Sequence, residues 1–305
     1  MRITIVGPGA LGCLLAALLS KAGHQVSLLD HQVSRAALLD RQGVCLVEGG
    51  RRQVYAVRAT TKPAAIAGSE ALLLCVKSAD VVSALARTAP LIKEGPLLVS
   101  MQNGLRHLPI LQNSAGAPWA LAVTAMGATL AAPGVVRFGG AGFTHFGFLK
   151  QAADERLAVL VELFNAAGMR AGISPDIEAA VWDKLLINVG VNALTAIYDC
   201  PNGKLLALPK ARETMRQAVL EAAAVAEARG VKINPDPVGR TLAVCRATAG
   251  NISSMLQDVR QGRDTEIEAI NGEIVRLAAT FNIPAPVNEQ LTSLVLNIST
   301  SRPGG

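Results

Sequence analysis

Short apolar runs and helical patterns alternate along the first half of the chain. Each run is four to seven residues long and rich in Leu, Ile and Val, which is typical of buried strands. Helical patterns at 10–23 and 78–90 lie between runs, and this alternation predicts a parallel, doubly wound α/β sheet. Gly-punctuated apolar segments across 119–148 predict further strands that close the sheet on one side. The predicted strands before them are 2–7, 25–30, 44–47, 53–59, 71–76 and 96–100.

The second half of the chain has a different pattern. From Asp154 the apolar residues recur with the period of a helix, interrupted only by a short strand pattern at 169–173. We therefore predict an α/β domain over 1–170 and an all-α domain over 171–305. The predicted helices are 154–168, 176–197, 210–229, 236–249, 252–260, 266–280 and 287–298.

The sequence "GPGALG" at 7–12 fits the GxGxxG motif and stands between the first strand and the first helix. Gly7 permits a tight turn, Gly9 lets the backbone approach a pyrophosphate, and Gly12 lets the helix pack closely on the strand. Asp30 ends the second strand, where a ribose-binding carboxylate is expected. The motif predicts a Rossmann dinucleotide-binding domain; the alternative is a glycine-rich turn without a ligand. The predicted cofactor-binding residues here are Gly7, Pro8, Gly9, Ala10, Leu11, Gly12, Asp30 and His31.

A narrow polar stripe runs along the predicted helix at 176–197. Lys184, Asn188 and Asn192 are four residues apart, so they lie on one helix face with a drift of about 40° per step, and Thr195 extends the line. One interpretation is structural: Lys184 snorkels to solvent and the amides form hydrogen bonds between helices. The other is that the stripe lines a cleft between the domains and binds a small polar ligand.

Composition and charge narrow the class of protein. Half of the 305 residues are hydrophobic and 17% are charged, so a large core is available. The net charge of +6 suits anionic ligands. Lys and Arg are scattered and aromatic residues make up only 3%, so we expect no nucleic-acid binding.

Neither a metal site nor a membrane segment is expected from the sequence. The five cysteines include no CxxC pair and the four histidines lack ligand spacing, which indicates no metal, no disulfides and a reducing cytoplasm. The first 23 residues mimic a signal peptide, but three glycines and a proline interrupt the apolar run. No uninterrupted apolar stretch reaches the ~18–20 residues of a membrane span. The oligomeric state is open, and a homodimer is possible.

Two C-terminal blocks, "WDKLLINVGVNALTAIYDCPNG" and "GNISSMLQDVRQGRDTEIEAINGE", resemble the ketopantoate reductase (2-dehydropantoate 2-reductase) family. The resemblance extends to the opening "ITIVGPGALG", to "VKS" after a predicted strand and to "QNG" after the next. It implies a Rossmann domain followed by a helical domain, with the active site in the cleft. The implied reaction is the NADPH-dependent reduction of ketopantoate to pantoate for pantothenate and coenzyme A synthesis.

The resemblance also implies roles for individual residues. Lys184 would be the general acid that protonates the C2 alkoxide as it forms, which fits the need for a cation with a transferable proton at that oxygen. Glu266 would lie where cofactor and substrate meet, and Ala128 would touch the nicotinamide end. The implied substrate-binding residues are Asn103, Lys184, Asn188, Asn192, Asn202 and Ser254, and the further cofactor-binding residues are Lys77, Asn103, Ala128 and Glu266.

Three of these residues have plain structural interpretations as well. Glu266 stands near a predicted helix start, where the helix dipole favours a carboxylate, and Thr265 with Glu268 predicts a capping box. Lys77 on its own would be an exposed loop lysine, and Asn103 a turn residue before glycine.

The chain departs from the family at the end of the second strand. Relatives commonly have an arginine there that holds the 2′-phosphate of NADPH, whereas this chain has Asp30 and His31. A carboxylate suits the ribose hydroxyls of NADH and repels a 2′-phosphate, but His31 and Arg35 can offer positive charge. We expect NADPH/NADP+ as the cofactor, with discrimination against NADH weakened to less than about 100-fold. The alternatives are a related reductase of another 2-oxo acid and a non-catalytic dinucleotide sensor.

Overall fold

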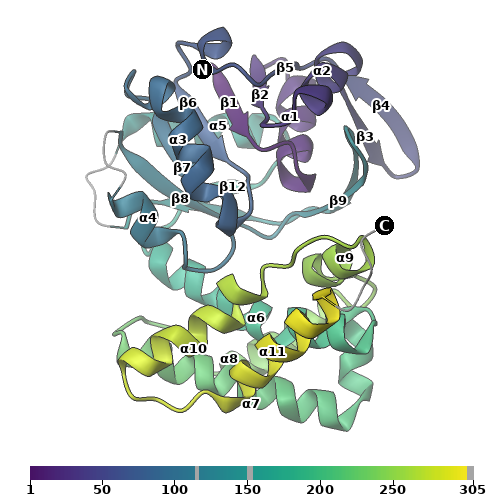
Figure 1. Ribbon diagram of the computed structural model, residues 1–305, viewed down its shortest axis with the longest axis vertical. Helices are drawn as coiled ribbons and strands as arrows, with labels where there is room; N and C mark the ends of the chain where they lie inside the picture. Colours follow the sequence, from purple (N-terminus) through teal and green to yellow (C-terminus); the bar gives the residue numbers. More distant parts are fainter. Residues whose placement is uncertain (114–116, 150–153, 301–305) are drawn as a thin grey trace. The chain divides into compact units, whose positions relative to one another are not determined.

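The computed structural model describes residues 1–113, 117–149 and 154–300 and divides the chain into two compact units (Figure 1). The first, the α/β unit, contains Met1–Gln102 and His107–Ile177. The second, the helical unit, contains Asn103–Arg106 and the chain from Glu178 onward. The division thus falls at Ile177, whereas the sequence pattern places it at residue 170. Residues 103–106 join the helical unit although they stand in the first half of the sequence.

Within the described residues, eight strands of the α/β unit form a sheet in the order β12-β11-β8-β7-β6-β1-β2-β5. All neighbours are parallel except β8 and β11. The central strands are buried along their whole length, which explains their continuous apolar runs. The strands are β1 (Ile3–Val6), β2 (Val26–Leu29), β5 (Arg58–Thr60), β6 (Ala71–Leu74), β7 (Leu97–Ser100), β8 (Trp119–Thr124), β11 (Thr144–Gly147) and β12 (Ala171–Ile173).

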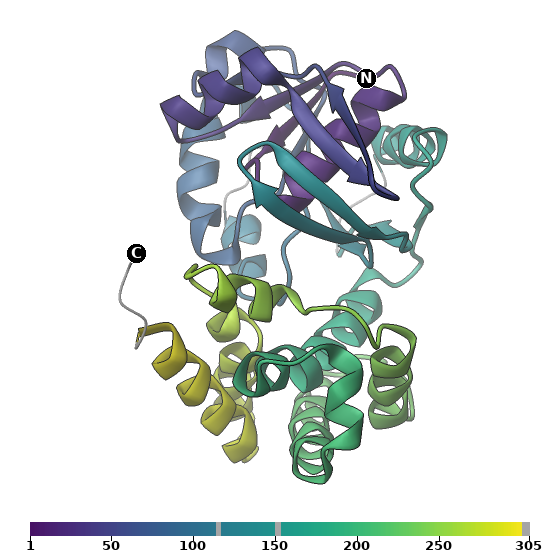
Figure 2. The ribbon, with the colours of Figure 1, turned by 90° about the vertical axis from the view of Figure 1, so that its right-hand side faces the viewer.

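A second sheet has the strand order β4-β3-β10-β9. The helix α1 (Ala10–Lys21) contacts β1 and β2 of the large sheet and also β3, β9 and β10, so it is enclosed by both sheets (Figure 2). The expectation that the segments across 119–148 all close one sheet is therefore wrong for β9 and β10. The strands of this sheet are β3 (Val44–Glu48), β4 (Arg51–Tyr55), β9 (Gly127–Ala132) and β10 (Val135–Gly140).

The remaining helices of the α/β unit include two that the sequence pattern did not indicate. In α2 (Val33–Gln42) only Ala36 and Leu39 are buried, so its apolar periodicity is weak, and α4 (Leu108–Asn113) has six residues. The predicted strand at 53–59 is in fact two strands, β4 and β5, in different sheets. The other helical elements are η1 (Pro63–Ile66), η2 (Ser78–Asp80), α3 (Val81–Ile92) and α5 (Glu155–Ala166).

The helical unit is built around the long helix α6 (Ile177–Tyr198). By length and composition α6 is apolar enough to cross a membrane, but 67% of its most apolar window is buried, as in a core helix. The predicted helix at 266–280 is interrupted at Ile270, which has φ −107° and ψ −89°. The other elements are η3 (Asn202–Ala207), α7 (Pro209–Ala228), α8 (Pro237–Ala247), α9 (Ser254–Arg260), η4 (Ile267–Ala269), α10 (Asn271–Thr280) and α11 (Pro286–Thr300).

Candidate active site

The glycine-rich turn joins β1 to α1. Gly7 has φ +98°, and its N–H donates to the carbonyl of Leu29 at 3.0 Å, which ties the turn to the end of β2. A Cβ on Gly12 would lie 2.1 Å from the Gly7 carbonyl oxygen, so only glycine allows α1 to approach the turn this closely. Pro8 is buried, and its carbonyl accepts a hydrogen bond from the thiol of Cys13 at 3.3 Å.

The outer side of this turn is open to a ligand. Gly9 is exposed, and a Cβ built on it would meet no atom within 4 Å. Gly9 is also the N-cap of α1 and provides no side-chain hydrogen bond, and Ala10 and Leu11 form the first turn of the helix. An uncapped helix N-terminus beside open backbone suits a phosphate group. The turn therefore fits the pyrophosphate of a dinucleotide.

Asp30 follows β2 and its carboxylate is held by four donors. Arg35 donates from Nε to Oδ2 and from Nη2 to Oδ1, each at 2.6 Å. The backbone N–H groups of His31 and Gln32 donate to Oδ1 at 2.6 and 3.2 Å. Burial raises the pKa of Asp30, but the Arg35 and backbone hydrogen bonds outweigh burial and lower it. The carboxylate is thus ionised and engaged within the protein.

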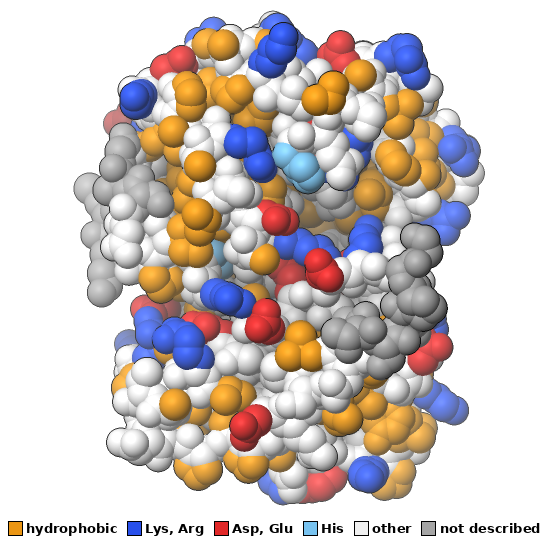
Figure 3. Space-filling model, in the orientation of Figure 1, with side chains coloured by type: hydrophobic (Ala, Val, Ile, Leu, Met, Phe, Trp, Pro, Cys, Tyr) orange, Lys and Arg blue, Asp and Glu red, His pale blue; other side chains and the backbone are white. Residues whose placement is uncertain are grey.

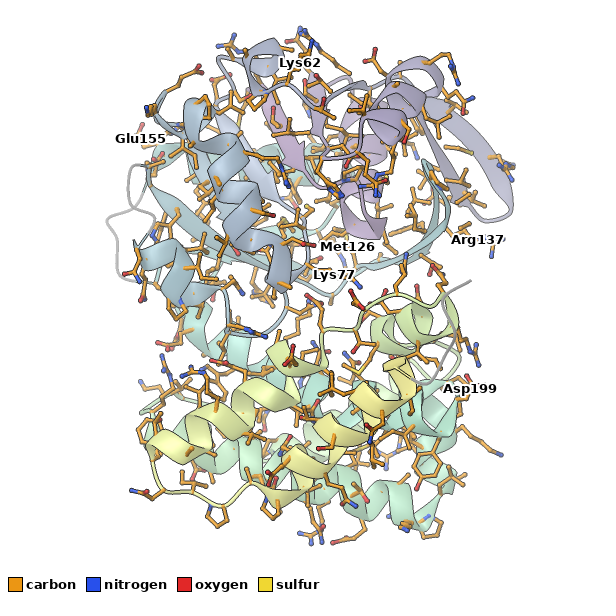
Figure 4. All side chains as sticks on the ribbon, in the orientation of Figure 1. Lys62, Lys77, Met126, Arg137, Glu155 and Asp199 are labelled. Carbon is orange, nitrogen blue, oxygen red and sulfur yellow. The ribbon has the colours of Figure 1, made fainter. Side chains whose placement is uncertain are left out.

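Lys77 and Ala128 lie in different parts of the α/β unit. Lys77 is half-buried and is the N-cap residue of η2, just after β6 (Figure 4). Ala128 is in β9, opposite Phe138 of β10, and packs against the hydrophobic core of the unit. Core packing accounts for Ala128 without a cofactor contact, so its predicted role stays a prediction.

In the helical unit, Lys184, Asn188 and Asn192 lie on α6. Lys184 and Asn188 are half-buried, and Asn192 is buried. No side-chain hydrogen bond joins Asn188 or Asn192 to any residue that the structure describes. The two amides are therefore not used to hold helices together, and their donors and acceptors remain for a ligand.

Lys184 has an altered acidity. Burial lowers the pKa of Lys184 to about 8, and the nearby negative charge of Glu266 opposes part of this change. A lysine with this pKa exchanges its proton near neutral pH, as general acid catalysis requires.

Glu266 accepts a hydrogen bond at 3.1 Å from Nδ2 of Asn103, a residue 163 positions earlier. The turn that contains Asn103 packs closely against η4. Gly104 of this turn has φ +75°, and a Cβ on it would lie 2.1 Å from the carbonyl oxygen of Ala269. The structure thus brings Lys184, Glu266 and Asn103 together in the helical unit. The capping box is wrong: Glu266 is the N-cap of η4, and the hydroxyl of Thr265 accepts only a 3.5 Å bond from the N–H of Ile267.

The two serines of "ISSM" differ in their surroundings. Ser253 is buried, shares a 2.6 Å hydrogen bond with Thr195 of α6, and caps α9 by accepting from the N–H of Leu256. Ser254 is exposed in the first turn of α9. Ser253 was not predicted from the sequence, although a serine directly before a helical pattern is an N-cap signal. It fixes α9 to the end of the polar stripe and so positions Ser254.

Asn202 and Gln102 both have structural partners. Asn202 is 9% exposed, and its Nδ2 donates to the hydroxyl of Thr248 at 2.9 Å, which fixes η3 to the end of α8. Gln102 donates to the carbonyls of Leu74 and Val76 and accepts from Ser100, so it holds the start of the "QNG" turn at the ends of β6 and β7. The only sequence signal for this structural role of Gln102 was its position directly before Asn103.

Charges are mixed on the face of the protein shown in Figure 3, where Lys and Arg side chains alternate with Asp and Glu. Among the described residues, no group of three or more His, Cys, Asp or Glu could hold a metal ion.

Models of a known protein family match both halves of the chain. The family model "Ketopantoate reductase PanE/ApbA" matches residues 3–151, and "Ketopantoate reductase PanE/ApbA C terminal" matches residues 176–299. The chain belongs to the ketopantoate reductase family. It is therefore an oxidoreductase-family protein, as the resemblance of its motifs indicates.

Relatives in this family match over nearly the whole chain. The 2-dehydropantoate 2-reductase of Halobacterium salinarum is 36% identical over 297 residues, which are 97% of this chain and 98% of that protein. That of Escherichia coli O157:H7 is 33% identical and covers 97% of this chain and 94% of its own length.

Solved structures of similar proteins have the same fold. A PanE/ApbA family ketopantoate reductase from Ralstonia eutropha has a TM-score of 0.89 and 32% identity, covering 98% of this chain and 99% of that chain. A D-mandelate dehydrogenase, solved with NADH and anilino(oxo)acetate, has a TM-score of 0.90 but 24% identity, covering 99% of each chain, and shows the fold alone.

Proposed function

We propose that this protein is a cytoplasmic 2-dehydropantoate 2-reductase that reduces ketopantoate to pantoate with NADPH, in pantothenate and coenzyme A synthesis. The observation that carries the proposal is the polar face of α6. Lys184 has its pKa lowered to about 8, and the two amides that follow it on this face have no partner among the described residues.

The cofactor would be held by the glycine-rich turn. Its pyrophosphate fits the open backbone at Gly9 and the uncapped N-terminus of α1, and Lys77 beyond β6 adds a cation at the carboxyl ends of the strands. When bound, NADPH supplies a hydride to the carbonyl carbon of the substrate. Side chains of this protein would donate the proton and orient the substrate.

Lys184 would supply the proton. As the carbonyl carbon gains the hydride, the electron pair of the C=O double bond moves to the oxygen, and the ammonium of Lys184 donates a proton to it. The product is an alcohol, and Lys184 is left neutral until it takes a proton from water. Glu266 stabilises the protonated form of Lys184 by its charge, and Asn103 holds the carboxylate of Glu266 in place.

Neutral groups would orient the substrate. Ketopantoate has a carboxylate and a hydroxyl besides its ketone, and Asn188, Asn192 and Ser254 can bind these by hydrogen bonds. Because amides and hydroxyls carry no charge, they add no second cation that would compete with Lys184, and they do not change the pKa of Lys184 strongly.

A turnover assay tests the proposal. Loss of NADPH absorbance is followed with ketopantoate and with a panel of other 2-oxo acids, such as pyruvate and phenylglyoxylate. Ketopantoate should have the largest kcat/KM, and Lys184→Ala should lower kcat by about 10²–10⁴-fold. Lys210→Ala, at an exposed position of α7, is the matched control. A larger kcat/KM with another acid would assign the protein to a related 2-oxo acid reductase.

A further inference from the structure

A cavity of about 540 Å³ lies at the amino ends of the parallel strands of the large sheet, a size typical of small-molecule sites. The starts of β1, β2 and β5, the end of α1, and η1 line it, at the edge of the sheet where the chain begins (Figure 1). A dinucleotide binds at the opposite edge, beside the carboxyl ends of the strands. The glycine-rich turn follows β1 at that opposite edge, about 13 Å from Ile3 at ~3.3 Å per residue. The cavity is therefore separate from the cofactor site.

The inner wall of the cavity is apolar. Two hydroxyls interrupt it, and both use their hydrogens within the protein. Ser69 donates to the carbonyl of Ile66 at 2.8 Å, so in the 2.8 Å bond between Thr4 and Ser69 the donor is Thr4. The inner wall thus offers no side-chain donor and suits an apolar group. Its aliphatic side chains, each at most 7% exposed, are Ile3, Val26, Val57 and Ile66.

The outer wall of the cavity is cationic. Arg58, the first residue of β5, is exposed, and no residue that the structure describes binds its guanidinium. The guanidinium of Arg2 comes no closer to the Glu70 carboxylate than 3.9 Å, at Nε, so both Nη groups remain for a ligand. Guanidinium groups bind the paired oxygens of a carboxylate or phosphate. The outer wall therefore suits an oxyanion.

His24 on the same wall has an unmet hydrogen-bonding need. Its Nε2 is buried and has no partner among the described residues. A buried polar atom without a partner costs free energy, and a ligand oxygen in the cavity would offset this cost.

We propose that this cavity is a second small-molecule site, which binds an organic oxyanion with a compact apolar body. The carboxylate or phosphate lies at Arg58 and Arg2, and the apolar body lies against the inner wall. An inorganic ion would leave the inner wall in water, and a neutral apolar molecule would leave the arginines without a counter-charge. The proposal does not depend on the proposed function, because the cavity shares no residue with the site on α6 or with the glycine-rich turn.

Calorimetric titration with simple compounds tests the proposal. The ligands are phenylacetate and phenyl phosphate, with acetate and inorganic phosphate as ions without an apolar body and phenylacetamide as the uncharged analogue. At least one of the two aromatic anions should bind with a Kd below about 1 mM, and the tighter one identifies the preferred oxyanion. Its partner ion should bind about 10–100-fold more weakly, because each ~55 Å² of apolar surface removed from water favours binding about tenfold.

Two variants assign the binding to this cavity. Arg58→Gln should weaken the aromatic anion by about 10–100-fold, the range for a lost charged hydrogen bond, and change phenylacetamide by less than about 3-fold. Ala67→Trp keeps every charge but fills the cavity from an exposed position with φ −56°, and should abolish binding. The matched control is Arg51→Gln, which removes the same charge from an exposed position of β4 outside the cavity and should leave all affinities unchanged.

Lys184→Ala is titrated in parallel, because a small carboxylate could also bind on α6. An affinity that falls in Lys184→Ala and not in Arg58→Gln overturns the proposal for the cavity and places the anion on α6. Equal affinities in the wild type and Arg58→Gln overturn it as well, as does binding of acetate as tight as that of phenylacetate. Should Ala67→Trp fail to fold, the comparison of Arg58→Gln with Arg51→Gln still decides it.

Discussion

Asn103 donates a hydrogen bond to Glu266 across 163 positions of sequence, at 3.1 Å. The contact links a turn that follows β7 to the segment before α10, and both belong to the helical unit. Glu266 in turn acts on Lys184 through its charge. An amide on a glycine turn therefore helps to set the electrostatic surroundings of the lysine that we propose as the general acid.

Gly104 makes this contact possible, and its replacement should break it. Gly104→Ala would put a Cβ 2.1 Å from the carbonyl oxygen of Ala269 at φ +75°, so the turn must move and carry Asn103 with it. Gly230→Ala is the matched control, because Gly230 has φ +74° and open space. The control should lower the free energy of unfolding by about 1–2 kcal/mol, and Gly104→Ala by a further ~1–3 kcal/mol, with a loss of kcat. If urea unfolding gave the same loss of free energy for Gly104→Ala and Gly230→Ala, the turn that contains Asn103 would be able to move at no additional cost.

The two adjacent serines should separate binding from stability. Ser254→Ala should raise KM for ketopantoate and leave the melting temperature unchanged, because Ser254 is exposed. Ser253→Ala should lower the free energy of unfolding by about 1–3 kcal/mol, since it removes the cap of α9 and the partner of buried Thr195. If Ser253→Ala raised KM more than Ser254→Ala did and left the free energy of unfolding unchanged, Ser253 would be the substrate-binding serine and Ser254 would not.

The asparagines of the helical unit should divide in the same way. Asn188→Ala and Asn192→Ala should each raise KM for ketopantoate, at about 0.5–3 kcal/mol per hydrogen bond lost, and leave cofactor affinity unchanged. Asn202→Ala should instead lower the melting temperature, because its amide joins η3 to Thr248. Steady-state kinetics and thermal melts on all three variants show which asparagines bind substrate and which stabilise the fold. Unaltered KM in the two α6 variants would favour the structural interpretation of the stripe.

Much of the fold could be predicted because its signals are local. The glycine spacing at 7–12 and the four-residue spacing on α6 each depend on neighbours within one or two turns, and both describe the observed elements. The family resemblance implied a site role for Asn103, but its hydrogen bond to Glu266 could not be predicted from local patterns, because it depends on how Gly104 fits against Ala269, far along the chain. The engagement of Asp30 by Arg35 depends on a rotamer, and α2 itself has too few buried residues to show a helical period.

The pH dependence of reduction should report Lys184 and its neighbour Glu266. Only the ammonium form of Lys184 can donate a proton, and burial lowers its pKa to about 8. The value of kcat/KM for ketopantoate, measured at saturating NADPH, should therefore be flat below this pH and fall about tenfold per unit above it. An unperturbed lysine, with a pKa of about 10.4, would keep the rate flat for more than two further units. Because the charge of Glu266 raises the pKa of Lys184, Glu266→Gln should move the fall to lower pH.

The matched control for this shift is Glu289→Gln, at an exposed position of α11. It removes the same charge and should leave the pH profile where it is in the wild type. The reverse reaction provides a second check, because oxidation of pantoate needs neutral Lys184 as a base and its rate should rise through the same pH range. A reduction profile that stays flat to pH ~10 would show that Lys184 keeps the pKa of a free lysine. A Glu266→Gln profile identical to that of the wild type would show that the carboxylate held by Asn103 does not act on this lysine.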